Sequence, residues 1–206
     1  MIVKNIINDI MPDIWPMVLI ITVIVSSLRI AYLMNGNKKF CLHRELLSLT
    51  FIIYILCLYH IVTFQDINYG VNNFIPFKEI FRYSIGSEKF IRNILGNILL
   101  FLPFGFFSSY YLKNKKIGVT AVLTLITSFT IEVVQYYIGR VFDIDDIILN
   151  VIGGVLGFLL FVGFDAISNR LPKMFRSDAF LNILVIIIII LVIIYGFNIN
   201  IFGFII

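Results

Sequence analysis

Charge is scarce in this sequence: only 14% of its 206 residues are Asp, Glu, Lys or Arg, whereas 60% are hydrophobic. A soluble domain carries about a quarter charged residues, because its surface must be solvated. The composition therefore excludes a soluble globular protein and predicts an integral membrane protein. The net charge of +4 does not indicate a nucleic-acid-binding protein, because the basic residues lie in short loops between hydrophobic runs.

Cysteine and histidine are also rare, with two residues of each. Cys41 falls in a basic loop and Cys57 inside a hydrophobic run, so we expect neither a disulfide between them nor a cysteine metal site. His43 and His60 have no acidic partner nearby in the sequence, which favours structural roles. These shortages leave no Ser-His-Asp or Cys-His arrangement for covalent catalysis.

Long hydrophobic runs are abundant, and six of them approach the roughly 20 residues that a membrane-spanning helix needs. The sequence predicts an all-α polytopic integral membrane helical bundle, folded as a single membrane domain over residues 1–206 and crossing the cell membrane several times. Gly196, Asn198 and Asn200 leave the end of the sixth span open. The expected spans are Trp15 to Met34, Leu46 to Phe64, Ile94 to Leu112, Ile117 to Ile138, Ile147 to Phe164 and Phe180 to Phe197.

Basic residues are distributed unevenly between the two sides that these spans create. The first, third and fifth loops hold ten of the 16 basic residues and three acidic residues. The N-terminus, the 65–93 loop and the 139–146 turn hold six basic and eight acidic residues. Because loops rich in Lys and Arg stay in the cytoplasm, this distribution predicts that both termini lie outside, together with the 139–146 turn.

The stretch at the start of the fifth span differs most from its background. Asp143, Asp146, Asn150, Gly153 and Gly157 follow one another at spacings of three or four residues, which places them on one face of a helix. The outer end of this face carries polar side chains. Deeper in the span, the two glycines leave the same face without side chains. The two glycines predict that a neighbouring helix approaches closely, as small residues allow in membrane bundles.

Polar residues of the third and fourth spans lie at helical spacing too: Asn93 with Asn97, and Glu132 with Gln135. A carboxylate inside a membrane span is energetically costly and marks a functional site by default. We therefore expect one partly hydrated ligand-binding site near the outer surface. Its expected members are Asn93, Asn97, Glu132, Gln135, Arg140, Asp143, Asp146 and Asn150.

A structural network is the alternative for the same residues. In that case Arg140 would pair with Glu132 or with an aspartate. Asp143 or Asp145 would cap the fifth helix and interact favourably with its dipole. The two interpretations differ in whether these side chains serve a ligand or only each other.

The longest loop, from Gln65 to Asn93, mixes aromatic and basic side chains. Such a segment suits the headgroup region of a membrane, where aromatic rings enter the acyl chains and Lys or Arg meets phosphate. Lys78, Arg82 and Arg92 are the candidates for contact with lipid headgroups. An ordinary aromatic belt, with lysine side chains that extend to the interface, is the alternative.

Four short blocks occur in a fixed order along the chain. They are Asn73-Phe-Ile-Pro-Phe, Asn93-x-x-x-Asn97 with Leu102-Pro103-Phe104-Gly105, Glu132-Val-Val-Gln135, and Asp143-Ile-Asp-Asp146-x-x-x-Asn150-x-x-Gly153-Gly154. The ordered set resembles the VanZ family over residues 73–164, with residues 15–64 and 180–206 as flanking transmembrane helices. The resemblance implies a small bacterial membrane protein associated with lowered susceptibility to teicoplanin-type glycopeptides.

Two functions are consistent with these features. The favoured one is a non-enzymatic protein, without a cofactor, that binds a lipid-linked cell-wall intermediate, another membrane lipid or the acyl tail of a lipoglycopeptide at the outer leaflet. The alternative is a metal-dependent enzyme or transporter acting on a phosphate-bearing membrane lipid. Glu132, Asp143 and Asp146 would then hold Mg²⁺, and Arg140 or Lys78 would face phosphate. The second aspartate pair that metal-dependent lipid phosphotransferases require is missing.

Overall fold

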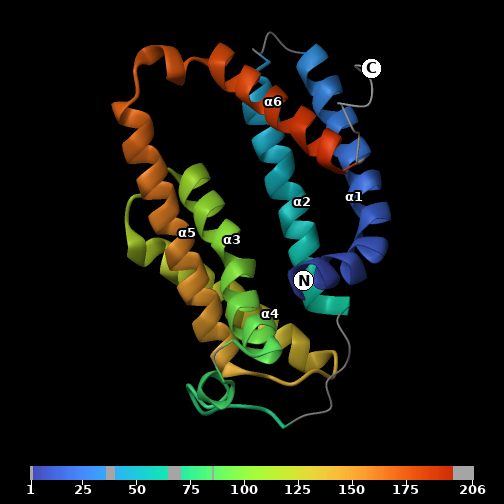
Figure 1. Cartoon of the computed structure of the whole chain (residues 1–206), viewed down its shortest axis with the longest axis vertical. Coiled ribbons are helices and arrows are strands. Elements are labelled where there is room, and N and C mark those ends of the chain that lie inside the picture. The colour runs from blue at the N-terminus through green and yellow to red at the C-terminus, as the bar shows by residue number, and fades with distance from the viewer. Residues whose placement is uncertain (1, 36–39, 65–70, 85, 197–206) are drawn as a thin grey trace, which may run out of the picture.

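The computed structural model describes residues 2–35, 40–64, 71–84 and 86–196, and every regular element in this part of the chain is helical (Figure 1). The α-helices are α1 (Ile2–Met34), α2 (Leu42–Phe64), α3 (Gly96–Leu112), α4 (Ile117–Tyr137), α5 (Ile144–Arg170) and α6 (Asp178–Gly196). Three short helical segments join them: η1 (Ile80–Arg82), η2 (Phe90–Leu95) and η3 (Lys173–Arg176).

Five helices of the described chain are long and apolar enough to cross a membrane, which confirms the predicted all-α helical membrane bundle. Their apolar segments are Ile14–Met34, Leu42–Thr63, Phe90–Leu112, Ile117–Tyr137 and Ile144–Arg170. The apolar part of α6 over Asp178–Ile190 is shorter, so a sixth crossing remains a prediction. The expected end of that span, near Phe197, lies outside the described residues.

Several helices extend beyond the hydrophobic runs that predicted them. α1 begins at Ile2 rather than at Trp15, and the third helix is preceded by the π-helical segment η2 rather than starting at Ile94. Hydropathy marks the part of a helix that suits hydrocarbon, whereas the helix itself continues until its backbone hydrogen bonds end. The run lengths therefore predict the membrane-embedded portions better than the helix boundaries.

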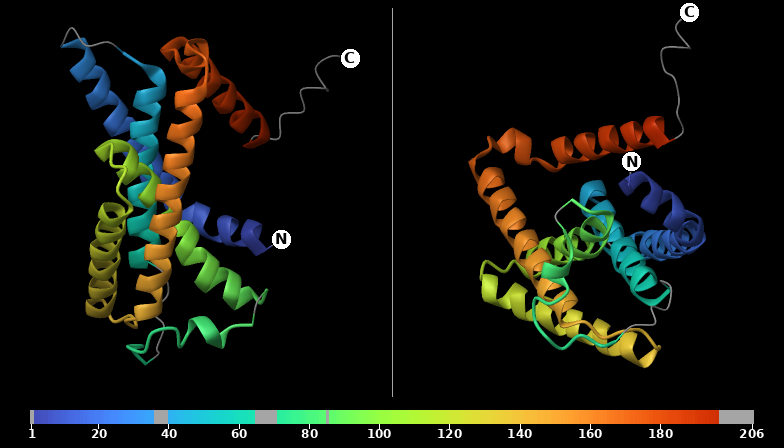
Figure 2. Two further views of the ribbon diagram at one scale, coloured as in Figure 1. Left: turned by 90° about the vertical axis from the view of Figure 1, so that its left-hand side faces the viewer. Right: turned by 60° about the horizontal axis from the view of Figure 1, so that its bottom comes forward.

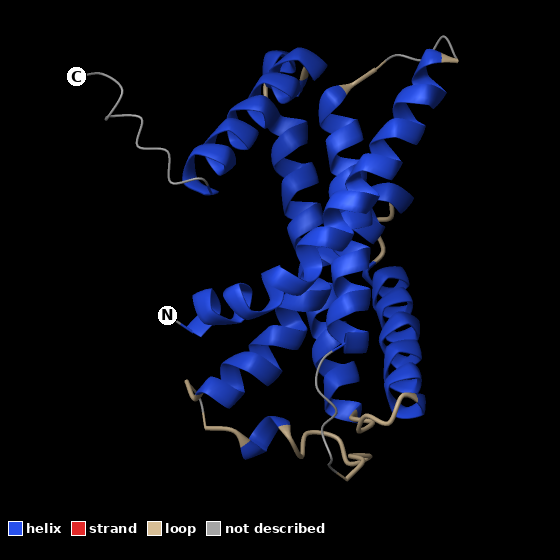
Figure 3. Ribbon diagram, turned by 90° about the vertical axis from the view of Figure 1, so that its right-hand side faces the viewer, coloured by secondary structure: helices blue, strands red, loops and turns tan. Residues whose placement is uncertain are grey.

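The connections gather towards two ends of the bundle (Figures 1 and 2). The start of α2 and the ends of α3 and α5 point towards one end, which carries the basic loops. At the other end, segment 71–84 lies beside the start of α5 and the turn after α4 (Figures 1 and 2), where Figure 3 draws the loops in tan. α6 turns away from α5 and returns towards α1 and α2 (Figure 1). The acidic residues expected in the site thus lie at the end that segment 71–84 covers.

Glycines allow α3 and α5 to pack with their backbones in contact. A Cβ on Gly153 would overlap the carbonyl group of Ile98, and a Cβ on Gly157 would overlap that of Leu102. No other residue type leaves room for such an approach, which lets dispersion and polar contacts act directly between the helices. This confirms the close packing predicted for the glycine face and identifies α3 as the neighbour.

A stripe of polar residues lines the side of α4 that faces the bundle. Thr120, Thr124, Ser128 and Glu132 recur at every fourth position and are all buried. The Thr124 hydroxyl donates to the Thr120 carbonyl at 2.8 Å, so it is satisfied within its own helix. Thr124 also touches Gly154 of α5, and this contact holds α4 close to α5. The stripe leads from the basic end to the buried Glu132.

Candidate functional site

Asp145, at the start of α5, holds segment 71–84 against the bundle. Its carboxylate is almost fully buried and accepts backbone N–H bonds from Phe77 at 2.5 Å, Glu79 at 2.7 Å and Ile80 at 3.2 Å. Phe77 has a φ of 66°, in the left-handed region that is unfavourable for a non-glycine residue. The Asp145 bonds therefore stabilise a strained turn.

Asp143 connects the same segment to the fifth helix. Asn73 and Asp143 form an isolated parallel bridge, in which the Asn73 N–H donates to the Phe142 carbonyl at 2.8 Å. The Asn73 amide also donates to Asp143 Oδ1 at 2.8 Å. Asp143 Oδ1 accepts the Asp145 N–H at 2.9 Å, which confirms that Asp143 caps α5. Burial raises the pKa of the Asp143 carboxyl above its ordinary value, and the bond from Asn73 opposes that rise.

Glu132 of α4 is also satisfied by protein groups. It is 2% exposed, and its Oε2 accepts the Asp143 N–H at 2.9 Å. The Gln135 amide is complementary to both neighbours when its nitrogen donates to Glu132 Oε1 at 3.0 Å and its oxygen accepts from Arg140 Nη1 at 2.9 Å. Arg140 Nη1 donates further to the Val62 carbonyl near the end of α2, at 2.5 Å. Glu132 thus belongs to a network that joins α4, the following turn and α2.

Asp146 differs from these carboxylates. It lies one residue beyond Asp145, remains partly exposed, and accepts a hydrogen bond at Oδ1 from the Asn97 amide of α3. Its Oδ2 accepts no hydrogen bond from the part of the chain that the structure describes. Asp146 therefore offers an oxygen to an incoming group, whereas protein donors occupy Asp145 and both oxygens of Glu132.

The two remaining expected members lie at the margins of this group. Asn93 lies near the Tyr83 hydroxyl, beside segment 71–84. Asn150 is buried one turn below Asp146, where its amide nitrogen donates to the Ser128 hydroxyl at 2.8 Å. Its Oδ1 has no hydrogen-bond partner among the described residues. The structure thus connects the expected residues from three helices, and it adds Asn73 and Asp145, which the site prediction omitted although both stand in the motif blocks.

The outward face of segment 71–84 is apolar and basic. Phe81 is 83% exposed, and Lys78 and Arg82 are exposed beside it. Arg82 pairs with Glu79 at 3.1 Å, while Lys78 forms no ion pair with a described residue. Arg92 is exposed on η2, close in sequence to Asn93. An exposed aromatic surface with adjacent cations has the composition of a segment that lies in a membrane interface.

The carboxylates proposed for Mg²⁺ under the enzyme hypothesis do not form a compact cluster. Within the described chain, Glu132, Asp143 and Asp146 do not bring one oxygen each within 4.8 Å of one another. Mg²⁺ requires oxygen ligands at about 2.0–2.1 Å in near-octahedral geometry. As arranged here, the three carboxylates do not provide that geometry.

Cys41, His43 and Asp178 lie together at the basic end, and each places one potential metal-ligand atom within 4.8 Å of the others, which corrects the expectation of no metal-ligand arrangement at the cysteines. Cys41 Sγ lies 3.2 Å from His43 Nδ1, and His43 Nε2 lies 3.9 Å from Asp178 Oδ1. The same groups have protein partners: Asn182 Oδ1 lies 3.0 Å from His43 Nδ1, and Arg44 pairs with Asp178 at 3.2 Å. The arrangement joins the starts of α2 and α6.

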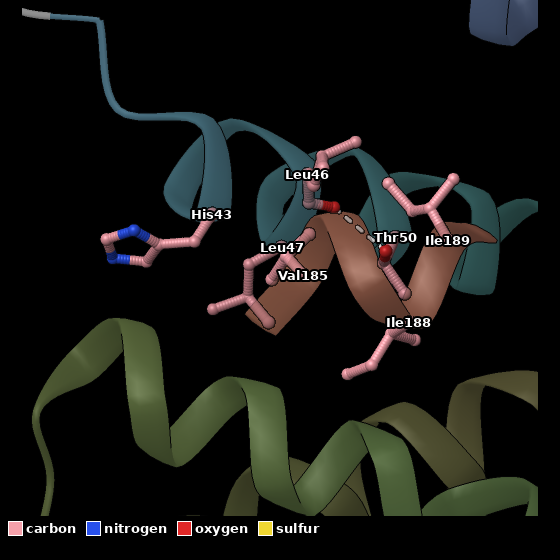
Figure 4. A pocket seen from close by; sticks show the side chains of 7 residues that line it. All are labelled: His43, Leu46, Leu47, Thr50, Val185, Ile188 and Ile189. Carbon is pink, nitrogen blue, oxygen red and sulfur yellow. Dashed lines mark hydrogen bonds between the residues drawn. The ribbon is translucent and has the colours of Figure 1, made fainter. Parts of the chain in front are cut away.

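A small cavity of about 230 Å³ lies next to this junction, between α2 and α6 (Figure 4). Most of its walls are aliphatic, and its polar side chains are His43 and Thr50. The Thr50 hydroxyl donates to the Leu46 carbonyl at 2.8 Å within its own helix. This cavity therefore offers little polar chemistry for a ligand.

Comparisons with known proteins point to one family. The family model described as VanZ/LLP1 matches residues 51–166. The chain is similar to Protein VanZ from Enterococcus faecium, with 31% identity over 100 residues that cover 46% of this chain and 59% of that protein. The chain thus spans less than two thirds of that relative's length. No solved structure gives a significant match. The matched region begins inside α2, a helix that the motif blocks had left in the flank.

Proposed function

Since the chain belongs to the VanZ/LLP1 family, we propose that it is a multi-pass protein of a bacterial cell membrane that binds a lipid-linked envelope component. Binding takes place at the acidic end of the bundle, which faces the outer leaflet under the positive-inside rule. By occupying that component, or by retaining the acyl tail of the drug, the protein lowers the susceptibility of cells to teicoplanin-type glycopeptides. This function requires no chemical reaction.

The carboxylate of Asp146, with one oxygen that no described group hydrogen-bonds, is the observation that carries the proposal. Asp143, Asp145 and Glu132 are further carboxyl groups of the same site, and protein groups already hydrogen-bond them. A fixed acidic site with one available oxygen suits a hydrogen-bond donor or an amine of a ligand. Because Asp145 holds segment 71–84 in place, the site is formed before the ligand arrives.

The basic and aromatic rim explains why the ligand would be a lipid. Lys78 is exposed on segment 71–84 and Arg92 on η2, where they can meet a phosphate. Phe74 and Phe81 are 65% and 83% exposed and can enter the acyl region. A lipid-linked envelope component combines phosphate, polar head and hydrocarbon in one molecule. It therefore matches the basic, acidic and aromatic parts of the site.

The metal-dependent alternative has less support from the geometry. Protein donors occupy both oxygens of Glu132, and its carboxylate would have to leave the Asp143 N–H to reach a metal. That exchange would strand a buried N–H group, which costs about 1–3 kcal/mol. The binding function needs no such rearrangement.

Isosteric substitutions separate the ligand contact from the scaffold. Asp146→Asn keeps an oxygen for the Asn97 amide and the size of the side chain, so we expect an unchanged melting temperature and a loss of protection against teicoplanin. In Glu132→Gln, an amide N–H group would face a buried N–H donor of the protein. We therefore expect a stability loss of about 1–3 kcal/mol. The measurements are the melting temperature in detergent and the teicoplanin susceptibility of cells producing each variant.

Asp178→Asn provides the matched control, because Asp178 is an exposed carboxylate at the opposite end of the bundle. It should leave both quantities unchanged. Full protection by the stably folded Asp146→Asn variant would refute the proposed site. Equal loss of stability and protection in Asp146→Asn would assign Asp146 to the structural network instead.

A further inference from the structure

A cavity of about 580 Å³ lies at the end of the bundle opposite to the acidic site. The start of α2, the end of α3 and the last turns of α5 contribute its walls. These three helix ends lie towards the basic end in Figure 1. The cavity shares no residue with the acidic site, so it calls for a separate explanation.

Cationic side chains outnumber acidic ones in this cavity. Its lining includes Arg44, Lys113 and Lys115, with Asp165 as its carboxylate. Lys115 Nζ pairs with Asp165 Oδ2 at 2.6 Å, so one positive charge is neutralised. Arg44 pairs with Asp178, which lies outside the lining. Lys113 is thus the one lining cation without a carboxylate partner among the described residues, and the cavity keeps one positive charge in excess.

Lys113 is the cation best placed to receive an anion. It ends α3 with a left-handed φ of 49°, and its exposed side chain forms no ion pair or hydrogen bond with the described residues. Its ammonium group presents three donors, which suits a phosphate oxygen. The neighbouring Lys116 is exposed as well but does not line the cavity.

Aromatic side chains form the inner wall. Tyr110 and Tyr111 of α3 and the buried Phe161 of α5 lie beside the cations. The Tyr111 hydroxyl donates to the Ser48 hydroxyl at 3.1 Å, which fixes the ring at the side of α2. A wall of this kind is apolar enough to hold the glycerol and upper acyl carbons of a lipid. Basic pockets between membrane helices on the cytoplasmic side bind such anionic headgroups.

We propose that this cavity binds a phosphate group, held by Lys113 with Arg44 and Lys115 around it. The phosphate belongs either to the headgroup of an anionic phospholipid of the inner leaflet or to a small soluble phosphate compound. The site is separate from the acidic end and does not depend on the function proposed for it.

Native mass spectrometry of the full-length protein in detergent tests the proposal, with phosphatidylglycerol, phosphatidylcholine and inorganic phosphate as probes. We expect tighter binding of phosphatidylglycerol than of phosphatidylcholine. Lys113→Gln should weaken binding of phosphatidylglycerol about fivefold, the effect of removing one positive charge near a membrane surface. Lys113→Arg should retain binding, and Lys116→Gln, the matched control from the same loop, should have no effect.

The competitor identifies the source of the phosphate. If millimolar inorganic phosphate displaces the lipid from the wild-type protein but not from Lys113→Gln, the result supports a soluble phosphate compound. Binding of phosphatidylglycerol that depends on Lys113 and resists inorganic phosphate supports the lipid headgroup. An equal effect of Lys113→Gln and Lys116→Gln would overturn the proposal, as would unchanged binding in the Arg44→Gln, Lys113→Gln, Lys115→Gln triple variant with a wild-type melting temperature.

Discussion

Individual carboxylates at the acidic end have different tasks although they lie close together in the sequence. Asp143 caps α5, Asp145 binds the backbone of segment 71–84, and Asp146 faces α3 with one oxygen available. Adjacent residues of an α-helix point about 100° apart, so each carboxylate meets a different neighbour. The acidic cluster is therefore part scaffold and part candidate ligand contact.

Asp145→Asn tests the scaffold role. The amide nitrogen would oppose backbone N–H donors, so we expect a stability loss of about 1–3 kcal/mol. Hydrogen exchange should become faster in residues 73–82, because the strained Phe77 turn loses its acceptor. Asp165→Asn, which removes an exposed ion pair on the same helix, is the control and should cost at most about 1 kcal/mol. Unchanged exchange in Asp145→Asn would show that other contacts hold the segment.

At the level of helices, the structure depends on the close pairing of α3 and α5 beneath the acidic group. Glycines at 153 and 157 bring the backbones together, and this approach places Asn97 within hydrogen-bond reach of Asp146. The close packing at the glycines and the hydrogen bond between Asn97 and Asp146 thus belong to the same interface between α3 and α5. A change in the glycine face should also disturb the site.

Gly157→Ala should destabilise the protein, because the added Cβ would overlap the Leu102 carbonyl of α3. Overpacking of this kind typically costs about 1–3 kcal/mol. Gly163→Ala on the same helix is a matched control, since a Cβ there meets nothing within 4 Å. It should be neutral or stabilising by up to about 1 kcal/mol, because alanine favours helix more than glycine does. Equal thermal stability of the two variants would contradict the observed interface.

For the whole molecule, the two ends have opposite chemical character. One end carries the carboxylates and the aromatic segment 71–84, and the other carries the basic loops and the phosphate cavity proposed above. Lys and Arg are retained on the cytoplasmic side during insertion, so this asymmetry predicts the orientation of the bundle. The proposed outer-leaflet function requires that orientation.

Cysteine labelling on intact cells measures the orientation directly. In a Cys41→Ala, Cys57→Ala background, Ser84→Cys should react with a membrane-impermeant thiol reagent, and Lys116→Cys should be protected. Both positions are exposed in the structure, so that accessibility to solvent does not distinguish them. Labelling of position 116 but not of position 84 would place the acidic end in the cytoplasm and contradict the outer-leaflet function.

The amino-acid sequence by itself determined the fold class, five membrane-compatible helices and the resemblance to the family. The thickness of the hydrocarbon core sets the length of an apolar run, and helical periodicity sets which polar residues share a face. Both are local properties of the chain. For the same reason the sequence predicted a close neighbour for Gly153 and Gly157, as well as a cap at Asp143 or Asp145.

Only the tertiary structure decided which residues meet across helices. The sequence did not reveal that α3 is the neighbour of the glycines, that Asp145 binds segment 71–84, or that Asp178 returns to Cys41 and His43. These contacts depend on how the helices are arranged and on where α6 turns, which periodicity within one helix does not specify. The difference between a buried structural carboxylate and a partly exposed one arises at this level, because burial is a property of the assembled bundle.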